Sequence, residues 1–459
     1  MNTPNHSLDR RTFLRRTATA GAFTILPSGL LNAFAQNEIL NIAIIGTGGQ
    51  GIVNMKQLFQ FDDVRVVALC DLNAESDYSA FYYRGTAGLK PALALLEAHY
   101  GEPCPVYNDY REMLDKEDID AVLIATPDHT HGYIALDVIA AGKHIYLEKP
   151  LCRTVEETRL VTEAARKAGV ATQMGNQGHS GEHLRLVCEW IWDGAIGDVH
   201  EVHVWCNNGV DRWSKYRELP PEQAVPEGFD WDRWCDPLPH RSYSDQYAPV
   251  RWRAWWAFCT GTIGDQGCHH IDPAFMALKI NQADHFTVEA THAGMTEETI
   301  PVASLIHYDV PARAGMPPVR ITWHEGGIQP RRPKGIEDNH PLSDKGILFQ
   351  GSKGAILGGG WSRSMRIIPE SAMRAYARPP KTLKRVKGHH RDWIDACRGL
   401  GEASSNFNYG GPLTEFALMG TVAQRTSKRL TFDWKNMKCP DAPETETLIK
   451  PQYKEGWKS

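Results

Sequence analysis

The sequence predicts an α/β protein whose N-terminal part is built around a doubly wound parallel sheet. Three observations support this: a β-branched apolar run at 39–45, a glycine-rich loop directly after it, and apolar runs that alternate with helical periodicity up to about residue 174. Apolar runs of this kind are typical of strands buried on both faces of a parallel sheet. Ligands of such sheets bind at the carboxyl ends of the strands.

The loop after the first strand has the glycine spacing of a dinucleotide-binding turn. Gly46, Gly48 and Gly51 occupy its first, third and sixth positions. Glycines at these places permit the tight turn, the approach of a pyrophosphate to the backbone, and close packing of helix on strand. Apolar residues at helical spacing after Gly51 predict a helix whose N-terminus can hold phosphates.

A second strand, expected at 64–70, ends at Asp71, twenty residues past Gly51. A carboxylate at this place can accept hydrogen bonds from the adenosine ribose hydroxyls and repels a 2′-phosphate, which favours NAD over NADP. We therefore predict a Rossmann-type NAD-binding domain over residues 37–160.

The same alternation continues along the chain. Strands are expected at 121–125, 143–147 and 170–174, with a helix at 133–141 and another from a capping box at Thr154 and Glu157 to about Ala168. Several polar or turn-forming residues fall at the carboxyl ends of these strands, where we expect them to face the cofactor: Thr126, Pro127, His131, Glu148 and Lys149.

The composition favours a globular protein with a small-molecule partner. The 459 residues include 50 Lys and Arg against 55 Asp and Glu, a net charge of −5 that gives no basic excess for binding nucleic acid. The ten cysteines are scattered and show no CxxC pair, so free buried thiols are expected. We predict no catalytic metal, because the histidine pairs lack further ligands at recognisable spacing: His129 with His131, His200 with His203, and His389 with His390.

The first 35 residues have the order of an export signal. Arg10 and Arg11 precede an apolar stretch at 18–31, and a small-x-small sequence ends at Ala35. This order is typical of a signal peptide, the arginine pair favours the twin-arginine type, and the apolar stretch is too short to span a bilayer. The leader carries +3, so its removal would leave 424 residues at −8. We expect a periplasmic protein, exported folded with its cofactor and not stably associated with the membrane after cleavage.

These motifs together resemble the glucose-fructose oxidoreductase, inositol dehydrogenase and MocA (Gfo/Idh/MocA) family. The resemblance rests on the glycine loop, the acidic end of the second strand, ATPDHTH at 125–131, Glu-Lys-Pro at 148–150, and GDQGCHHID at 264–272. It implies an α+β C-terminal domain with an open, mainly antiparallel sheet, expected at 161–440 and followed by a tail at 441–459. Such a sheet favours a homo-oligomer, a dimer or a tetramer.

The resemblance also implies the catalytic residues Lys149, Asp265 and His269. Removing hydride from a secondary alcohol requires a base for the hydroxyl proton, and an imidazole suits this at neutral pH. A neighbouring lysine stabilises the developing alkoxide. Asp265, one helical turn before His269, can orient the ring if the segment is helical.

The residues that bind the substrate are less sharply defined by the sequence than those that bind the cofactor. Nine of the 14 tryptophans lie between Trp190 and Trp256, where they could bind carbohydrate or simply pack the second domain. The stretch 211–247 is expected to be an ordered insertion over the cleft. His270 could instead have an indirect or structural role, and Asp272 could instead cap His269. Gln177 and His179 could be ordinary loop residues. The substrate candidates are Gln177, His179, Trp252, Trp255, His270 and Asp272.

Two functions fit these residues. The first is an NAD-dependent oxidoreductase that acts on a secondary hydroxyl or ketone of a sugar or glycoside, with a tightly bound cofactor that is recycled on the protein. The alternative is a redox-neutral NAD-dependent glycosidase, which oxidises the sugar, eliminates the aglycone, adds water and returns the hydride. A protein that binds the cofactor without catalysis is disfavoured by the presence of all three catalytic candidates. Free NAD is scarce outside the cytoplasm, so export favours on-protein recycling in either case.

Overall fold

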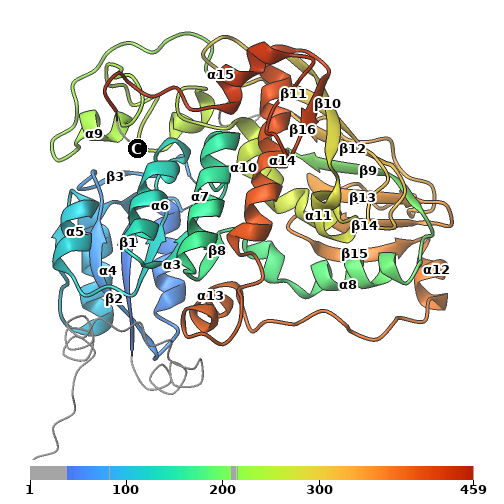
Figure 1. Cartoon of the computed structure of the whole chain (residues 1–459), viewed down its shortest axis with the longest axis horizontal. Coiled ribbons are helices and arrows are strands. Elements are labelled where there is room, and N and C mark those ends of the chain that lie inside the picture. Colours follow the sequence, from blue (N-terminus) through green and yellow to red (C-terminus); the bar gives the residue numbers. More distant parts are fainter. Residues whose placement is uncertain (1–38, 82, 208–212, 214, 458–459) are drawn as a thin grey trace, which may run out of the picture. The chain divides into compact units, whose positions relative to one another are not determined.

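The computed structural model describes residues 39–457 except Tyr82, residues 208–212 and residue 214 (Figure 1). The predicted export signal at 1–35 lies outside the described residues. Within the described part, none of the helices is both long and apolar enough to cross a bilayer.

The predicted parallel sheet is present and has six strands in the order β5-β2-β1-β6-β7-β8, with every pairing parallel. The order reverses on either side of β1, as in doubly wound folds, so a crevice opens at the carboxyl ends of β1 and β6. The strands are β1 (Leu40–Ile45), β2 (Val64–Cys70), β5 (Val106–Tyr107), β6 (Ala121–Ile124), β7 (His144–Leu147) and β8 (Thr172–Met174).

Helices cover both faces of this sheet. One apolar cluster joins the sheet to α3 (Gly49–Leu58), α4 (Leu89–Tyr100) and α13 (His389–Cys397), the last of which comes from late in the chain. The opposite face packs against α5 (Tyr110–Lys116), α6 (His131–Ala140) and α7 (Val155–Ala168). A two-stranded hairpin, β3 (Ser76–Asp77) with β4 (Thr86–Ala87), is inserted after β2.

The predicted capping box is present at the start of α7. The Thr154 hydroxyl accepts a hydrogen bond from the Glu157 backbone N–H, and the Glu157 carboxylate accepts one from the Thr154 backbone N–H. The helix ends at Ala168, followed by Gly169 in the left-handed conformation. It then returns the chain to β8, so the first sheet continues past residue 160, where we expected its domain to end.

The second sheet has eight strands in the order β15-β14-β13-β9-β12-β11-β10-β16. All pairings are antiparallel except β9 with β12, which confirms the predicted mainly antiparallel sheet. The strands are β9 (Val199–Cys206), β10 (His285–Ala293), β11 (Ala303–Val310), β12 (Val319–Glu325), β13 (Lys345–Gly351), β14 (Ala355–Gly359), β15 (Arg363–Ile368) and β16 (Leu430–Asp433). The remaining helices are α8 (Glu182–Trp192), α9 (Trp231–Cys235), α10 (Gly261–His270), α11 (Asp272–Ala277), α12 (Glu370–Ala375), α14 (Phe407–Thr426) and α15 (Glu446–Ile449).

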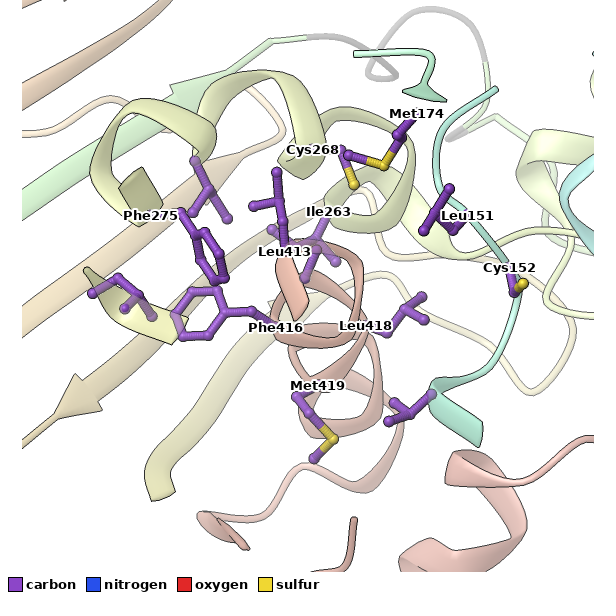
Figure 2. Close-up of a cluster of buried hydrophobic side chains, with 14 of the residues drawn as sticks. Leu151, Cys152, Met174, Ile263, Cys268, Phe275, Leu413, Phe416, Leu418 and Met419 are labelled. Atoms are coloured by element: carbon purple, nitrogen blue, oxygen red, sulfur yellow. The ribbon is translucent and has the colours of Figure 1, made fainter. Parts of the chain in front are cut away.

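Helix α14 is the element that joins the two sheets. It packs against α7, α10 and β10, and Figure 1 shows it between the first sheet with its helices and the second sheet. Its apolar side chains meet residues that follow β7, the last residue of β8, and residues of α10 and α11 (Figure 2). The labelled members of this cluster are Leu151, Cys152, Met174, Ile263, Cys268, Phe275, Leu413, Phe416, Leu418 and Met419. A single continuous core therefore links the dinucleotide half to the second half.

One buried carboxylate reinforces this junction. Glu415 of α14 accepts two hydrogen bonds of 2.7 Å from the Arg159 guanidinium of α7. Its Oε2 also accepts a 2.6 Å hydrogen bond from the Trp434 indole N–H. Bidentate geometry and a third donor satisfy a charge that is almost completely removed from water.

Replacing Glu415 by Ala should destabilise the protein by about 3–5 kcal/mol, because it leaves the Arg159 charge and the Trp434 N–H without their acceptor. Denaturant unfolding of the purified protein measures this. The matched control is Asp309→Ala, which breaks the more exposed pair with Arg320 and should change stability by less than about 1 kcal/mol. Equal losses in the two variants would contradict a special role for the buried pair.

Candidate active site and cofactor cleft

The glycine loop has the close approaches that the motif predicts. Gly46 has φ of +89°, and a methyl group on it would lie 2.7 Å from the carbonyl carbon of Ala125 at the end of β6. A methyl group on Gly51 would lie 2.0 Å from the Gly46 carbonyl oxygen. Only glycine fits either place, because backbone atoms cannot move aside. The loop therefore brings the N-terminus of α3 against β1 and β6.

Asp71 lies beside the glycine loop and hydrogen-bonds to Thr47 within it. Its Oδ2 accepts hydrogen bonds from the Thr47 backbone N–H at 2.6 Å and the Thr47 hydroxyl at 2.9 Å, while Oδ1 accepts one from the Asn73 N–H at 2.9 Å. Burial raises the pKa of this carboxyl, and these hydrogen bonds oppose the rise. The carboxylate thus lies at the end of β2, where the adenosine ribose of a dinucleotide would bind.

A cavity runs along the carboxyl ends of β1, β2 and β6. Five of the predicted cofactor residues line it: Gly46, Gly48, Asp71, Thr126 and Pro127. The facing wall comes from the β3–β4 hairpin, the aromatic insertion and the C-terminal tail, and includes Tyr78, Phe81, Trp252, Arg253 and Trp457.

The glycine loop and Asp71 offer the groups that a dinucleotide needs. A methyl group on Gly48 would lie 2.5 Å from the Tyr78 hydroxyl, so only glycine lets the tyrosine of the hairpin pack directly against the loop. Backbone N–H groups at the start of α3 and the Asp71 carboxylate provide the donors and acceptor that a pyrophosphate and a ribose need. The residues present therefore fit NAD.

Two predicted cofactor residues lie behind the cavity wall. Both ring nitrogens of His131 lie against backbone carbonyl oxygens, of Pro150 at 2.8 Å and Thr126 at 2.9 Å, and burial lowers its pKa to about 4. Glu148 accepts hydrogen bonds from the side-chain amides of Asn54 at 2.8 Å and Gln177 at 3.1 Å. These contacts fix the loops that follow β6 and β7, on which Thr126 and Lys149 stand.

The two charged catalytic candidates meet directly. Lys149, after β7, donates hydrogen bonds from Nζ to the Asp265 carboxylate at 2.6 Å and the Asp265 carbonyl oxygen at 2.9 Å. Their side chains are only 15% and 20% exposed. Burial lowers the pKa of Lys149, but Asp265 outweighs it and holds the pKa above its ordinary value. Burial by itself raises the pKa of Asp265, but the positive charges of Lys149 and Arg253 outweigh burial and hold this pKa far below its ordinary value. Both groups are therefore charged at neutral pH.

The two adjacent histidines of α10 point in different directions, as expected. The His269 ring stacks on Trp361 with ring centres 3.9 Å apart, and its Nδ1 is buried without a hydrogen-bond partner among the described residues. His270 instead accepts a hydrogen bond from the Trp361 backbone N–H at 3.3 Å. Burial and the nearby Lys149 hold the pKa of His269 well below its ordinary value, and burial lowers that of His270 to about 3.

The expected hydrogen bond from the His269 ring to the Asp265 carboxylate is replaced by others. The Asp265 carboxylate binds Lys149 and, at 2.7 Å, the side-chain amide of Gln266. An ammonium offers a buried carboxylate a stronger, charge-assisted hydrogen bond than a neutral imidazole does. Asp265 therefore orients the lysine rather than the histidine.

A second polar cluster lies behind this site. His179 Nδ1 is 3.0 Å from the Asp272 carboxylate, which also accepts hydrogen bonds from the Tyr409 hydroxyl and the Asn176 amide. His179 and Asp272 are both buried, so in this structure they join the loop after β8 to α11 and α14. Gln177 bonds to Tyr146 and Glu148, close to the loop that carries Lys149.

The tryptophan-rich segment between residues 213 and 258, referred to as the aromatic insertion, mainly packs on itself where the structure describes it. Trp255 is completely buried and donates its indole N–H to the Gln246 carbonyl oxygen at 2.6 Å. Trp252 reaches the cofactor cavity, where Arg253 lies over its ring at 4.1 Å and over Phe81 at 4.8 Å. The rest of this aromatic core includes Trp213, Phe229, Trp231, Trp234, Tyr243, Tyr247, Trp256 and Phe258.

Comparison with known families agrees with this geometry. Residues 40–176 match the family model for the NAD-binding Rossmann fold of the Gfo/Idh/MocA oxidoreductases, and residues 186–310 match the model for their C-terminal alpha/beta domain. The chain belongs to the Gfo/Idh/MocA oxidoreductase family. The two matches together cover more than half of its length.

Curated relatives of this Gfo/Idh/MocA protein include glycosidases. A glycosyl hydrolase family 109 protein of Shewanella sp. strain MR-4 is 28% identical over 303 residues, which cover 61% of this chain and 57% of that protein. An alpha-N-acetylgalactosaminidase of Shewanella oneidensis is 26% identical over 302 residues, with the same coverage. The matched region thus spans little more than half the length of these relatives.

Solved structures share the fold of this Gfo/Idh/MocA protein. The WlbA dehydrogenase of Bordetella pertussis, in complex with NADH and UDP-GlcNAcA, superposes with a TM-score of 0.59 at 18% identity, over 85% of this chain and 98% of that one. The aldose-aldose oxidoreductase of Caulobacter crescentus superposes with a TM-score of 0.57 at 17% identity, over 86% and 99% of the two chains.

Three features of this Gfo/Idh/MocA site were not found by sequence reasoning. Tyr78 and Phe81 come from a short hairpin without a motif, and Arg253 was not among the candidate site residues. Asp128 stands within the ATPDHTH segment, but its proximity to Asp265 depends on tertiary structure. Among the described residues, no three His, Cys, Asp or Glu side chains converge as metal ligands.

The Asp71→Asn variant should bind NAD at least about tenfold more weakly, because a neutral amide is a poorer acceptor for two ribose hydroxyls. Denaturing the purified parent protein and identifying the released nucleotide should give NAD, and equilibrium dialysis of the apoprotein measures the affinity of both forms. Exposed Asp284→Asn is the control. Release of NADP from the parent protein would contradict the interpretation of Asp71.

Proposed function

We propose that this protein is an NAD-dependent oxidoreductase that acts on a secondary hydroxyl or ketone of a sugar or glycoside and keeps its cofactor tightly bound. The observation that carries the proposal is the buried Lys149–Asp265 pair, next to a cavity that fits NAD, in a chain of an oxidoreductase family. NAD, when bound, accepts or returns the hydride.

The residues of the chain supply binding, orientation and charge. The Lys149 ammonium is fixed by two hydrogen bonds to Asp265, so its remaining hydrogen-bonding capacity can be directed at the substrate oxygen. A fixed positive charge at that oxygen stabilises the alkoxide that develops as the C–H bond breaks. His269 is neutral, and its imidazole can hydrogen-bond a second hydroxyl.

The walls of the cofactor cavity support tight retention of the dinucleotide. They come from four parts of the chain: the glycine loop, the β3–β4 hairpin, the aromatic insertion and the C-terminal tail. The tail is held by Tyr453, which hydrogen-bonds to Glu157, and by Lys454, which pairs with Asp236. A dinucleotide bound there would contact the protein on several sides, which favours slow release.

A redox-neutral glycosidase is the second candidate, and the names of the curated relatives favour it. In that reaction the sugar is first oxidised, the aglycone is eliminated, water adds, and the carbonyl is reduced again. The first and last steps need the same cofactor and the same charged groups as the oxidoreductase. The two functions differ in whether the reaction ends with a net change of oxidation state.

We also propose export to the periplasm by the twin-arginine route, with removal of residues 1–35, and assembly into a homo-oligomer. The residues that support export are Arg10, Arg11 and the small-x-small sequence that ends at Ala35. A protein that folds around its cofactor before export fits this route, and the enclosed cavity is consistent with it. The open second sheet offers a surface for self-association.

The purified protein, without added NAD, should reduce a ketose acceptor at the expense of a free sugar. Incubation with a panel of free sugars plus a ketose, and separately with aryl glycosides, separates the two functions. Catalytic release of the aglycone without net absorbance change at 340 nm would contradict the oxidoreductase and support the glycosidase.

Lys149→Ala and His269→Ala should each abolish turnover while the nucleotide stays bound, because both residues lie outside the walls that enclose the dinucleotide. Turnover and the nucleotide content of the denatured protein are measured together. Lys116→Ala, an exposed lysine of α5, is the control and should keep full activity. Full activity of either site variant would remove that residue from the mechanism.

Replacing Arg10 and Arg11 together by Lys should keep the protein in the cytoplasm, because the twin-arginine route reads the arginine pair. Cell fractionation and the mass of the product report export and cleavage. Periplasmic protein of unchanged amount in the double variant would contradict this route.

A further inference from the structure

Asp128 is a buried carboxylate that the mechanism above does not use. It lies just after β6 in a 3₁₀ turn, Asp128–Thr130, and is only 4% exposed. Its Oδ2 accepts a 2.8 Å hydrogen bond from the Thr260 hydroxyl. No hydrogen bond is made to its Oδ1 by the described residues, so this oxygen is available to a ligand.

Asp128 lies close to the catalytic pair of Lys149 and Asp265. A small cavity is lined by Asp128 together with Asp265, Arg253 and Thr262. The charges that act on Asp128 are those of Lys149 after β7, Arg253 in the insertion and Asp265 of α10. Two buried thiols, Cys259 and Cys268, also face it, and burial raises the pKa of each to about 12, so both stay protonated.

The other groups of this site are poor proton acceptors at neutral pH. Lys149 already carries its proton, and Asp265 is a weak base because the lysine stabilises its charge. His269 is neutral but weakly basic, since burial and Lys149 disfavour its protonated form. Burial and the charge of Asp265 raise the pKa of Asp128 to about 6, close to the value that suits a general base.

We propose that Asp128 is the acid–base residue of the site and accepts the proton of the substrate hydroxyl on Oδ1. This rests on the proposed function, in either of its two forms. In the oxidation direction the O–H bond breaks and its proton moves to Asp128. The C–H bond breaks with its electron pair going as hydride to bound NAD, and the C–O bond becomes a carbonyl. In the reduction direction Asp128 returns the proton.

Thr260 hydrogen-bonds to Asp128 and lowers the pKa of that carboxyl group. Its hydroxyl is the one hydrogen-bond donor to Asp128 among the described residues, and it stabilises the ionised form. Its backbone carbonyl accepts a 2.6 Å hydrogen bond from Thr421 of α14, which fixes the turn before α10. The position of Asp128 relative to Asp265 is therefore set by the same helix that joins the two halves of the protein.

The first test is the pH profile of turnover. The parent protein should lose kcat/KM for oxidation as the pH falls below about 6, because the carboxylate becomes protonated. Asp128→Asn should lower kcat/KM by at least about a hundredfold and remove this limb, with the bound nucleotide unchanged. Thr260→Val should move the limb to higher pH, whereas Thr260→Ser, which keeps the donor, should leave it in place.

The second test does not depend on activity. The pKa of Asp128 is about 6 in the folded state and near its reference value of 3.8 in the unfolded state. Deprotonation therefore destabilises the fold as the pH rises between these values, and the loss is complete above about 6. The melting temperature of Asp128→Asn should exceed that of the parent by an amount that grows from pH 4.5 to 7 and then stays constant.

Asp284→Asn, at an exposed position of the second half, is the matched control for both tests. It should show the parent pH profile and no pH-dependent gain in melting temperature. An Asp128→Asn variant that keeps the parent kcat/KM, or a melting-temperature difference that is flat with pH, would overturn the role of Asp128. A sugar panel with no turnover by the parent protein would instead contradict the proposed function.

Discussion

The Lys149 ammonium and the Asp265 carboxylate belong to different halves of the chain and meet where water is largely excluded. Removing two charges from water costs several kcal/mol for each, and their attraction repays this only when the geometry is held accurately. The fold provides that geometry by placing Lys149 after a central strand of the first sheet and Asp265 on α10. Helix α14 packs on both α10 and α7, so the apolar cluster of Figure 2 holds Lys149 and Asp265 next to each other.

Burial and the charges of this pair together determine the protonation of their neighbours. Burial, reinforced by Lys149, disfavours a second positive charge and keeps His269 neutral. Burial, reinforced by the Asp265 carboxylate, raises the pKa of Asp128. The buried ion pair and its surroundings thus give the site a permanent cation, a neutral imidazole and a carboxyl group that can change its protonation state near neutral pH. Groups with such separated pKa values can take different roles in acid–base chemistry.

The features that follow local rules were predictable from the sequence. Strand β2, the dinucleotide turn and the capped helix α7 lie where the patterns placed them, because apolar periodicity, glycine spacing and a Thr-Glu capping box act within a few residues. That Lys149, Asp265 and His269 share one site came only from family resemblance, and the pairing of Lys149 with Asp265, which spans 116 residues, was not predicted. Sequence could not show that Asp265 prefers Lys149 to His269, or that Trp255 packs in a core while Trp252 reaches the cavity. Those outcomes depend on burial and on competition between partners, which emerge only when distant segments meet.

The walls of the cofactor cavity bear on both of the proposed functions. Arg253 lies over both Phe81 and Trp252, so it joins the hairpin wall to the insertion wall, and opening either one breaks an aromatic–cation contact. A cofactor that dissociates slowly must return to its starting oxidation state while it is still bound, by reaction with a second substrate or with the same sugar later in the reaction. In both cases one set of side chains has to serve oxidation and reduction in turn. Lys149 can do so unchanged, because Asp265 keeps it charged in both directions, whereas the proton acceptor must gain and lose a proton in each cycle. That requirement favours a group that titrates near neutral pH over one whose charge is fixed, and of the two aspartates Asp128 and Asp265 it is Asp128 that meets it.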